Sequence, residues 1–123
     1  MFLTVNEWKN AVPIGIIITI PKSTSWSEYR RELDAALDGA VMNYKMSSFP
    51  KVKIGDLCYV CHDGFVKGHM KISGMGEKEF TCTTTGNNWA GKFLERTGQF
   101  YHVKDVHPMK GFQGFRYVYS EFN

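Results

Sequence analysis

A run of branched apolar residues at positions 15–20 is the first clear pattern in the chain. Because β-branched side chains favour extended backbone and Pro21 closes the run, this segment predicts a buried strand. Ser25 and Glu28 follow with the S-x-x-E spacing of a capping box. This spacing predicts a helix that begins at Trp26.

The expected helix, at about residues 26–38, has one apolar face. Side chains on this face recur every three or four residues and comprise Trp26, Tyr29, Leu33, Ala36 and Leu37. The opposite face carries Arg30, Arg31 and Asp34. This period is typical of a helix that packs one side against a core, and Gly39 is expected to end it.

After the helix the apolar period changes to two, which is typical of strands. Residues 52–62 and 65–73 are expected to form a hairpin, because Asp63 and Gly64 between them are a strong signal for a tight turn. Further strands are expected at 79–84, 92–95, 99–106 and 115–122, with turns or loops at 74–76, 85–91, 96–98 and 107–114.

The segments 92–95 and 99–106 are expected to pair as a second hairpin about residues 96–98. One early helix followed by five or six short strands predicts an α+β fold. The sheet should be small, strongly bent and mixed or antiparallel, and it either stays open or closes as a barrel.

Length and composition fit a single domain over residues 1–123. The chain has 123 residues, of which 43% are hydrophobic, enough for one core and too many for a disordered chain. Its longest apolar run is far short of the roughly 20 residues that cross a bilayer. The N-terminal residues lack the basic segment and cleavage site of a signal peptide, so we expect a cytoplasmic protein without a membrane partner.

The formal net charge is +3, and the positive excess lies after Gly39. A weak positive field suits an anionic ligand such as a nucleotide or a nucleic acid. Lysines scattered over an ordinary soluble protein are the competing interpretation.

Cys58, Cys61 and His62 match the C-x-x-C-H spacing of a haem attachment site. On a strand, however, alternation places Cys58 and Cys61 on opposite faces. A zinc site with His69 and Cys82 would require the strand end to bend. We therefore expect neither haem nor metal, and no other cofactor, and interpret the cysteines as small core residues in a reducing compartment.

The loop before the helix is the first candidate site. Helix N-termini attract anions, and Lys22 adds a full charge beside Ser23 and Thr24. A lysine next to hydroxyl groups can also activate a nucleophile. The alternative is that Ser25 only caps the helix and the other hydroxyl groups are solvated.

Two later segments offer groups that bind bases. Thr84 and Asn88 can hydrogen-bond to a base edge while Trp89 stacks on its face; alternatively, Trp89 plugs the mouth of the barrel. Near the C-terminus, a second candidate set comprises Phe112, which can stack, and the planar groups of Gln113 and Arg116. Alternatively, the glycines there bend the chain into its last strand and Phe112 enters the core.

Residues 50–60, 64–68 and 111–117 resemble the PUA-like superfamily, most closely its ASCH and EVE/YTH-type branches. The shared features are a strand that opens with Gly55-Asp56, a hairpin whose second glycine is Gly68, and a closing glycine-rich strand. The resemblance extends over about residues 14–120. It implies a small pseudobarrel beside one or two helices, with RNA binding, recognition of modified bases, or hydrolysis of nucleic acids or nucleosides.

The resemblance also implies positions for a site. The family's pocket lies beside the loop that leads into the helix, where this chain has Lys22, Ser23, Thr24 and Trp26. A hydrolase of the ASCH kind would use Lys22 and Thr24, at a spacing that differs from the family's, with Glu79 or Glu95 as the carboxylate. A YTH-type aromatic cage would use Trp26 and Trp89.

These observations lead to one principal hypothesis and two alternatives. The principal hypothesis is a module that binds a nucleotide, a modified base or single-stranded RNA without turnover, either to read RNA or to sequester a nucleotide signal. In it Trp26 and Trp89 stack on bases, and phosphate is held by Lys22, Arg96 and Arg116. The alternatives are an ASCH-like hydrolase or ribonuclease and a protein-interaction domain.

Overall fold

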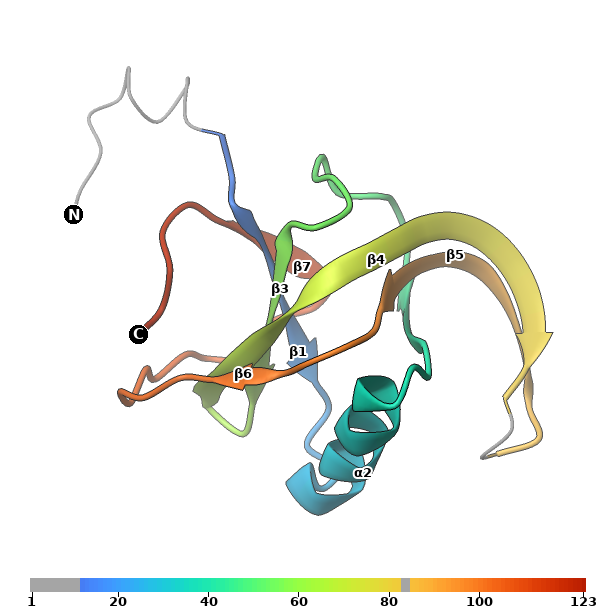
Figure 1. The fold of residues 1–123 in the computed structure, drawn as a ribbon, viewed down its shortest axis with the longest axis horizontal. Helices are drawn as coiled ribbons and strands as arrows, with labels where there is room; N and C mark the ends of the chain where they lie inside the picture. Colours follow the sequence, from blue (N-terminus) through green and yellow to red (C-terminus); the bar gives the residue numbers. More distant parts are fainter. Residues whose placement is uncertain (1–11, 83–84) are drawn as a thin grey trace.

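The computed structural model describes residues 12–82 and 85–123. These residues form one bent sheet and one helix, so the expected α+β class is confirmed (Figure 1). The elements are β1 (Gly15–Ile20), α2 (Trp26–Leu37), β2 (Met42–Met46), β3 (Leu57–His62), β4 (Phe65–Thr81), β5 (Asn88–Arg96), β6 (Tyr101–His102) and β7 (Phe115–Val118).

The strands follow the order β2-β5-β4-β3-β1-β7, and β6 pairs with β4. The β1–β3 pair is parallel, and the other pairs are antiparallel. β4 joins the two halves of the sheet, because its first part pairs with β3 and β6 and its second part pairs with β5. The second part of β4 and its partner β5, which also pairs with β2, curl away from the rest of the sheet, and we call them the β4–β5 ribbon (Figure 1).

The expected turn at Gly74 and Gly76 is wrong. β4 continues through both glycines, and the register with β5 shifts between Ile72 and Gly74. Such a β-bulge bends and twists a strand without ending it. The glycines therefore bend one long strand where the sequence pattern suggested two short ones.

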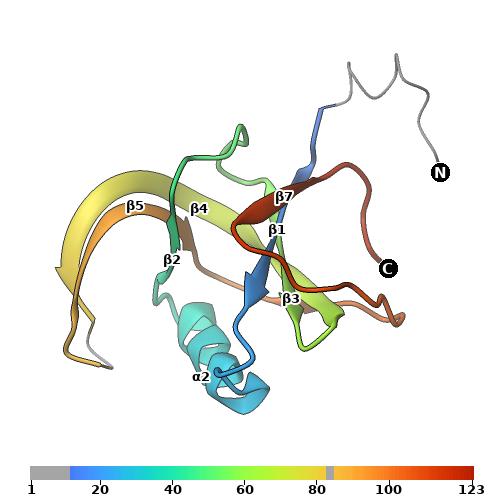
Figure 2. The same ribbon diagram turned by 180° about the vertical axis from the view of Figure 1, so that it is seen from behind.

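The sheet is open, and the alternative of a closed barrel is not confirmed. Among the described residues, the strands at the two ends of the order, β2 and β7, do not pair with each other. Side chains link the two ends instead: the Tyr44 hydroxyl donates to the Gly114 carbonyl at 3.2 Å, and the Lys51 amide donates to the Tyr117 hydroxyl at 2.8 Å. Figure 2 shows β7 beside β1, and β2 beside β5.

The helix begins as predicted. Ser25 is its N-cap, and the Ser25 hydroxyl accepts a hydrogen bond from the Glu28 amide at 3.2 Å. The helix ends at Leu37, and Gly39 has the positive φ of 104° that favours glycine. Leu37 was expected on the buried face, but 61% of its surface is exposed because it lies in the last turn.

Two hydrophobic clusters lie on the two faces of the sheet. The inner cluster packs under α2 and includes Ile16, Cys58 and Val60. The outer cluster includes Tyr59 and Cys61, and residues from the C-terminal segment cover it. The predicted placement of Cys58 and Cys61 on opposite faces is therefore confirmed.

Several strand boundaries differ from the expected ones. β3 begins only at Leu57, β5 already begins at Asn88 inside the expected loop, and β7 ends at Val118. β2 was not expected. The second expected hairpin is also wrong, because β6 pairs with β4 and not with β5.

Gly68 explains the unexpected place of β6. A Cβ atom at this position would lie 2.2 Å from the Tyr101 carbonyl oxygen, so only glycine lets β6 approach β4 here.

Among the described residues, no helix is long and apolar enough to cross a membrane.

Candidate functional site

An open cleft of about 490 Å³ lies at the N-terminal end of α2. Its walls are Trp26 from the helix, residues 65–67 from the start of β4, and residues 102–107 from β6 and the segment that follows. We call it the Trp26 cleft. Of the residues expected to bind ligand, Trp26 is the one that lines this cleft.

Trp26 is half-buried and rests on other rings. Tyr29 stacks beside it at 5.5 Å between ring centroids, and Phe100 lies 6.0 Å away. The Lys67 ammonium lies over the indole, 5.6 Å from its centroid, and 5.8 Å from the centroid of Phe65. Among the described residues, no carboxylate forms an ion pair with Lys67.

The loop that carries Lys22 is fixed to the sheet below the cleft. His62 is buried, and its Nε2–H donates to the Thr24 carbonyl at 2.8 Å. The parallel pairing of β1 with β3 places Ile20 opposite His62, so the residues that follow each strand end at the same edge. The hydrogen bond from His62 and the pairing of β1 with β3 thus fix this loop without the help of a ligand.

Lys22 and Ser23 are exposed, and Thr24 is half-buried. Lys22 forms an ion pair with Asp63, with 3.6 Å between Nζ and Oδ1. The carboxylates that the ASCH resemblance required lie elsewhere, because Glu79 and Glu95 are on the β4–β5 ribbon. Asp63 was missed by the sequence analysis, although parallel pairing of β1 and β3 would have brought it beside Lys22.

Asn88 and Trp89 lie at the far end of the β4–β5 ribbon. The Asn88 Oδ1 accepts a hydrogen bond from the Thr81 hydroxyl at 2.7 Å, and Trp89 pairs in register with Phe80. Thr84, which was expected to contact a base with them, lies outside the described residues. The structure does not bring Trp89 to Trp26, since the ribbon end and the start of α2 are separated in both views (Figures 1 and 2).

Arg96 was expected to hold phosphate at the surface, but it lies in the core with 2% of its surface exposed. Its position on β5 places it opposite Met42 and Ile72 on the inner face. The Arg96 Nη1 donates to the Tyr29 hydroxyl at 2.8 Å. Burial raises the pKa of Tyr29 in spite of the adjacent guanidinium, so this hydroxyl stays neutral at physiological pH.

Phe112, Gln113 and Arg116 do not line the Trp26 cleft. Phe112 packs against the outer cluster, whereas Trp26 packs against the inner one. The Arg116 guanidinium lies 4.6 Å from the centroid of the Phe112 ring. Gln113 and Arg116 are exposed, but they do not join the residues at α2.

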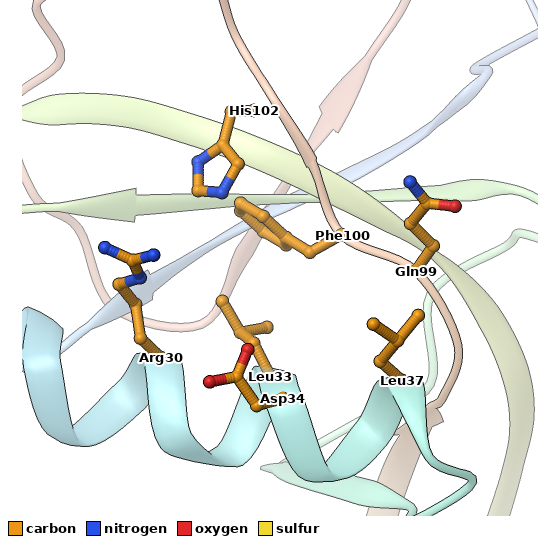
Figure 3. A pocket seen from close by; sticks show the side chains of 7 residues that line it. All are labelled: Arg30, Leu33, Asp34, Leu37, Gln99, Phe100 and His102. Atoms are coloured by element: carbon orange, nitrogen blue, oxygen red, sulfur yellow. The ribbon is translucent and has the colours of Figure 1, made fainter.

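A second, smaller hollow of about 150 Å³ lies along α2 and was not predicted. Arg30, Leu33, Asp34 and Leu37 form its floor, and Gln99, Phe100 and His102 form its other wall (Figure 3). We call it the Arg30 hollow. The spacing of the four helix residues could have indicated that they share one side of α2. The other wall depends on the pairing of β6 with β4, which no local sequence pattern predicts.

The cysteines do not form a joint site. Because Cys58 and Cys61 lie on opposite faces of β3, their sulfur atoms cannot bind one ion or one haem. Burial raises the pKa of both thiols and keeps them protonated. The described part of the chain contains no cluster of three or more His, Cys, Asp or Glu residues that could hold a metal ion.

Comparison of the chain with protein-family models, with curated proteins and with solved structures found no match.

Proposed function

We propose that this protein binds a nucleotide, or an unpaired base of single-stranded RNA, in the Trp26 cleft and does not turn it over. The observation that carries the proposal is the position of Trp26, a half-buried indole in an open cleft, with a lysine above it that forms no ion pair within residues 12–82 and 85–123. The resemblance to PUA-like domains supports the same location, since their pocket lies beside the loop that leads into the helix.

The cleft has the size and lining of a small-molecule site. Its volume of about 490 Å³ lies within the range of about 300–1,000 Å³ that is typical of ligand pockets. Phe65 and Val106 add apolar surface, and Lys67 and Lys104 outnumber the acidic Asp105. A planar, apolar and anionic ligand suits this combination.

Stacking of a base on Trp26 requires Lys67 to move. The cation–π contact that is lost contributes about 0.5–1 kcal/mol at an exposed site. A base stacked on an aromatic ring contributes about 1–3 kcal/mol, so the exchange is favourable. The lysine stem is flexible, and its ammonium group can then pair with the phosphate of the same nucleotide.

Fluorescence anisotropy of a labelled tetrauridylate tests the proposal with a matched pair of variants. Lys67→Glu and Lys71→Glu make the same charge change on the same strand, but only Lys67 lines the cleft. We expect Lys67→Glu to weaken binding at least tenfold and Lys71→Glu to change it less than threefold. Equal losses would contradict the Trp26 cleft as the site.

The same samples distinguish the alternatives. If wild-type protein does not bind tetrauridylate or uridine monophosphate below millimolar concentration, the proposal is wrong, and the result favours the alternative of a protein-interaction domain. If chromatography of the incubated RNA shows products whose formation Lys22→Ala abolishes, the absence of turnover is wrong. We expect intact RNA, because the exposed Lys22 is paired with Asp63 and does not line the Trp26 cleft.

A further inference from the structure

We infer that the ligand is longer than one nucleotide: a single-stranded RNA segment that runs along α2 from the Trp26 cleft into the Arg30 hollow. This inference rests on the proposed function and deepens it, because it selects an oligonucleotide over a mononucleotide. It is carried by His102, which lines both hollows, by the stretch of α2 that the two hollows share, and by Arg30, which forms no ion pair within the described residues.

The helix provides a continuous floor. The expected position of Arg30 and Asp34 on the face opposite Trp26 is wrong. Trp26, Arg30 and Asp34 follow one another at intervals of four residues, so they lie along one stripe of α2. Trp26 lines the first hollow, and Arg30 and Asp34 line the second. A strand of RNA that leaves Trp26 along the helix therefore reaches Arg30 within one turn.

One residue of the opposite wall is common to both hollows. His102 lines both hollows, and its ring packs against Phe100 with 4.9 Å between centroids. Phe100 in turn lies 6.0 Å from Trp26. Three rings thus form a row between the hollows, and Figure 3 shows the Phe100 and His102 side chains above the helix residues.

The length of the groove exceeds that of one nucleotide. Residues 26–37 of an α-helix span about 16 Å at about 1.5 Å per residue. Stacked bases follow each other at about 3.4 Å, so the groove has room for at least two.

Arg30 provides the charge for a second phosphate. Its guanidinium forms no ion pair within the described residues, although Asp34 lies one turn away on the same stripe. In Figure 3 it points from the helix toward the side where Phe100 and His102 lie. A guanidinium can bind phosphate through two parallel hydrogen bonds, and the Asp34 carboxylate can accept from an exocyclic amino group such as that of cytosine.

The test compares ligand lengths in wild type, Arg30→Ala and Arg31→Ala. Both arginines are exposed on α2, but only Arg30 lines the hollow, and alanine is compatible with the helix at either position. Calorimetric titrations with cytidine monophosphate and with tricytidylate give the affinities. We expect wild type to bind the trinucleotide at least tenfold more tightly than the mononucleotide.

Arg30→Ala should remove most of this gain and leave the affinity for the mononucleotide within twofold. It should also reduce the slope of log K against log salt concentration by about 0.7, the value for one phosphate contact on a single strand. Arg31→Ala should change neither quantity. Equal wild-type affinity for the two ligands, or equal effects of the two variants, would overturn the inference.

The two proposals fail in different ways. If the mononucleotide binds and Lys67→Glu weakens it, but length makes no difference, only the extension into the Arg30 hollow is wrong. If neither ligand binds, the proposed function itself is wrong.

Discussion

Two regions of the molecule each combine a partly exposed tryptophan with a lysine over aromatic rings, and in one of them these side chains line the Trp26 cleft. In the β4–β5 ribbon, Lys78 lies over Phe80 and Phe93, but it also forms an ion pair with Glu95. At the start of α2, Lys67 lies over Trp26 and Phe65 without a carboxylate partner among the described residues.

The difference lies in how many parts of the chain meet. At the far end of the ribbon, beyond the part of β5 that pairs with β2, two neighbouring strands remain, and there Trp89 pairs with Phe80. Three segments far apart in sequence meet at Trp26 and surround a hollow. An aromatic ring beside a lysine is therefore a poor indicator of a site unless tertiary structure adds further walls and leaves the charge unpaired.

The junction between the two regions should give the largest effect. Arg96 lies where the ribbon enters the core, and Arg96→Ala removes a large buried side chain and leaves the Tyr29 hydroxyl without its partner. We expect a loss of about 2–5 kcal/mol in the free energy of unfolding, measured with urea. Tyr29→Phe, which keeps the ring, should cost less. A loss below 1 kcal/mol for Arg96→Ala would show that the ribbon is not anchored here.

Replacement of each tryptophan by leucine, one at a time, tests the comparison directly. Trp26→Leu should weaken RNA binding by about 1–3 kcal/mol, a factor of roughly 5 to 150, because it removes the stacking surface. Trp89→Leu should leave the affinity within twofold, since Trp89 does not line the cleft. Anisotropy titrations give both numbers, and the account is wrong if the Trp89 variant loses more.

The stability of the protein should depend on pH through His69, the residue of β4 that pairs with Tyr101 of β6. This ring lies between Tyr59 and Tyr101, and burial lowers the pKa of His69 while Glu121 raises it and Lys71 lowers it. The pKa of His69 is lower in the folded protein than in the unfolded chain. The unfolded chain therefore binds more protons at this residue as the pH falls below about 6.5, and protonation favours unfolding. His69 should therefore favour folding less at pH 5.5 than at pH 7.5.

The measurement for His69 is the free energy of unfolding at these two pH values. His69→Gln should lose less stability than wild type between them. An equal or greater loss in the variant would contradict the assigned direction.

The smallest effect is expected for the ribbon's ion pair. Lys78→Met removes a contact between side chains that are about one-third exposed, so it should change the free energy of unfolding by no more than about 1 kcal/mol. RNA affinity should stay unchanged. A tenfold loss of affinity would move the binding surface to the ribbon.

The sequence predicts well the elements whose signals are local. β1 is a branched run closed by a proline, Ser25 and Glu28 mark the start of α2, and Asp63 and Gly64 both have the positive φ that their hairpin turn requires. Gly74 misled the analysis because a glycine signals a bulge as readily as a turn.

The site was harder to predict, because its parts meet only through tertiary structure. Trp26 became a candidate through the resemblance, which implies a pocket beside the loop that leads into the helix, but Lys67 and His102 reach it through strand pairings that no local pattern reveals. Arg96 shows the opposite error. An arginine in a candidate turn suggests the surface, whereas the antiparallel register of β5 directs this one inward under Tyr29.

The most direct test of the central claim is a nuclear magnetic resonance titration of the protein with tricytidylate, in which the indole N–H signals are assigned by Trp→Phe variants. We predict that the Trp26 indole and the amides of residues 65–67 and 99–107 shift, and that the Trp89 indole and the ribbon amides do not. Shifts confined to Trp89 and residues 88–92 would contradict the account.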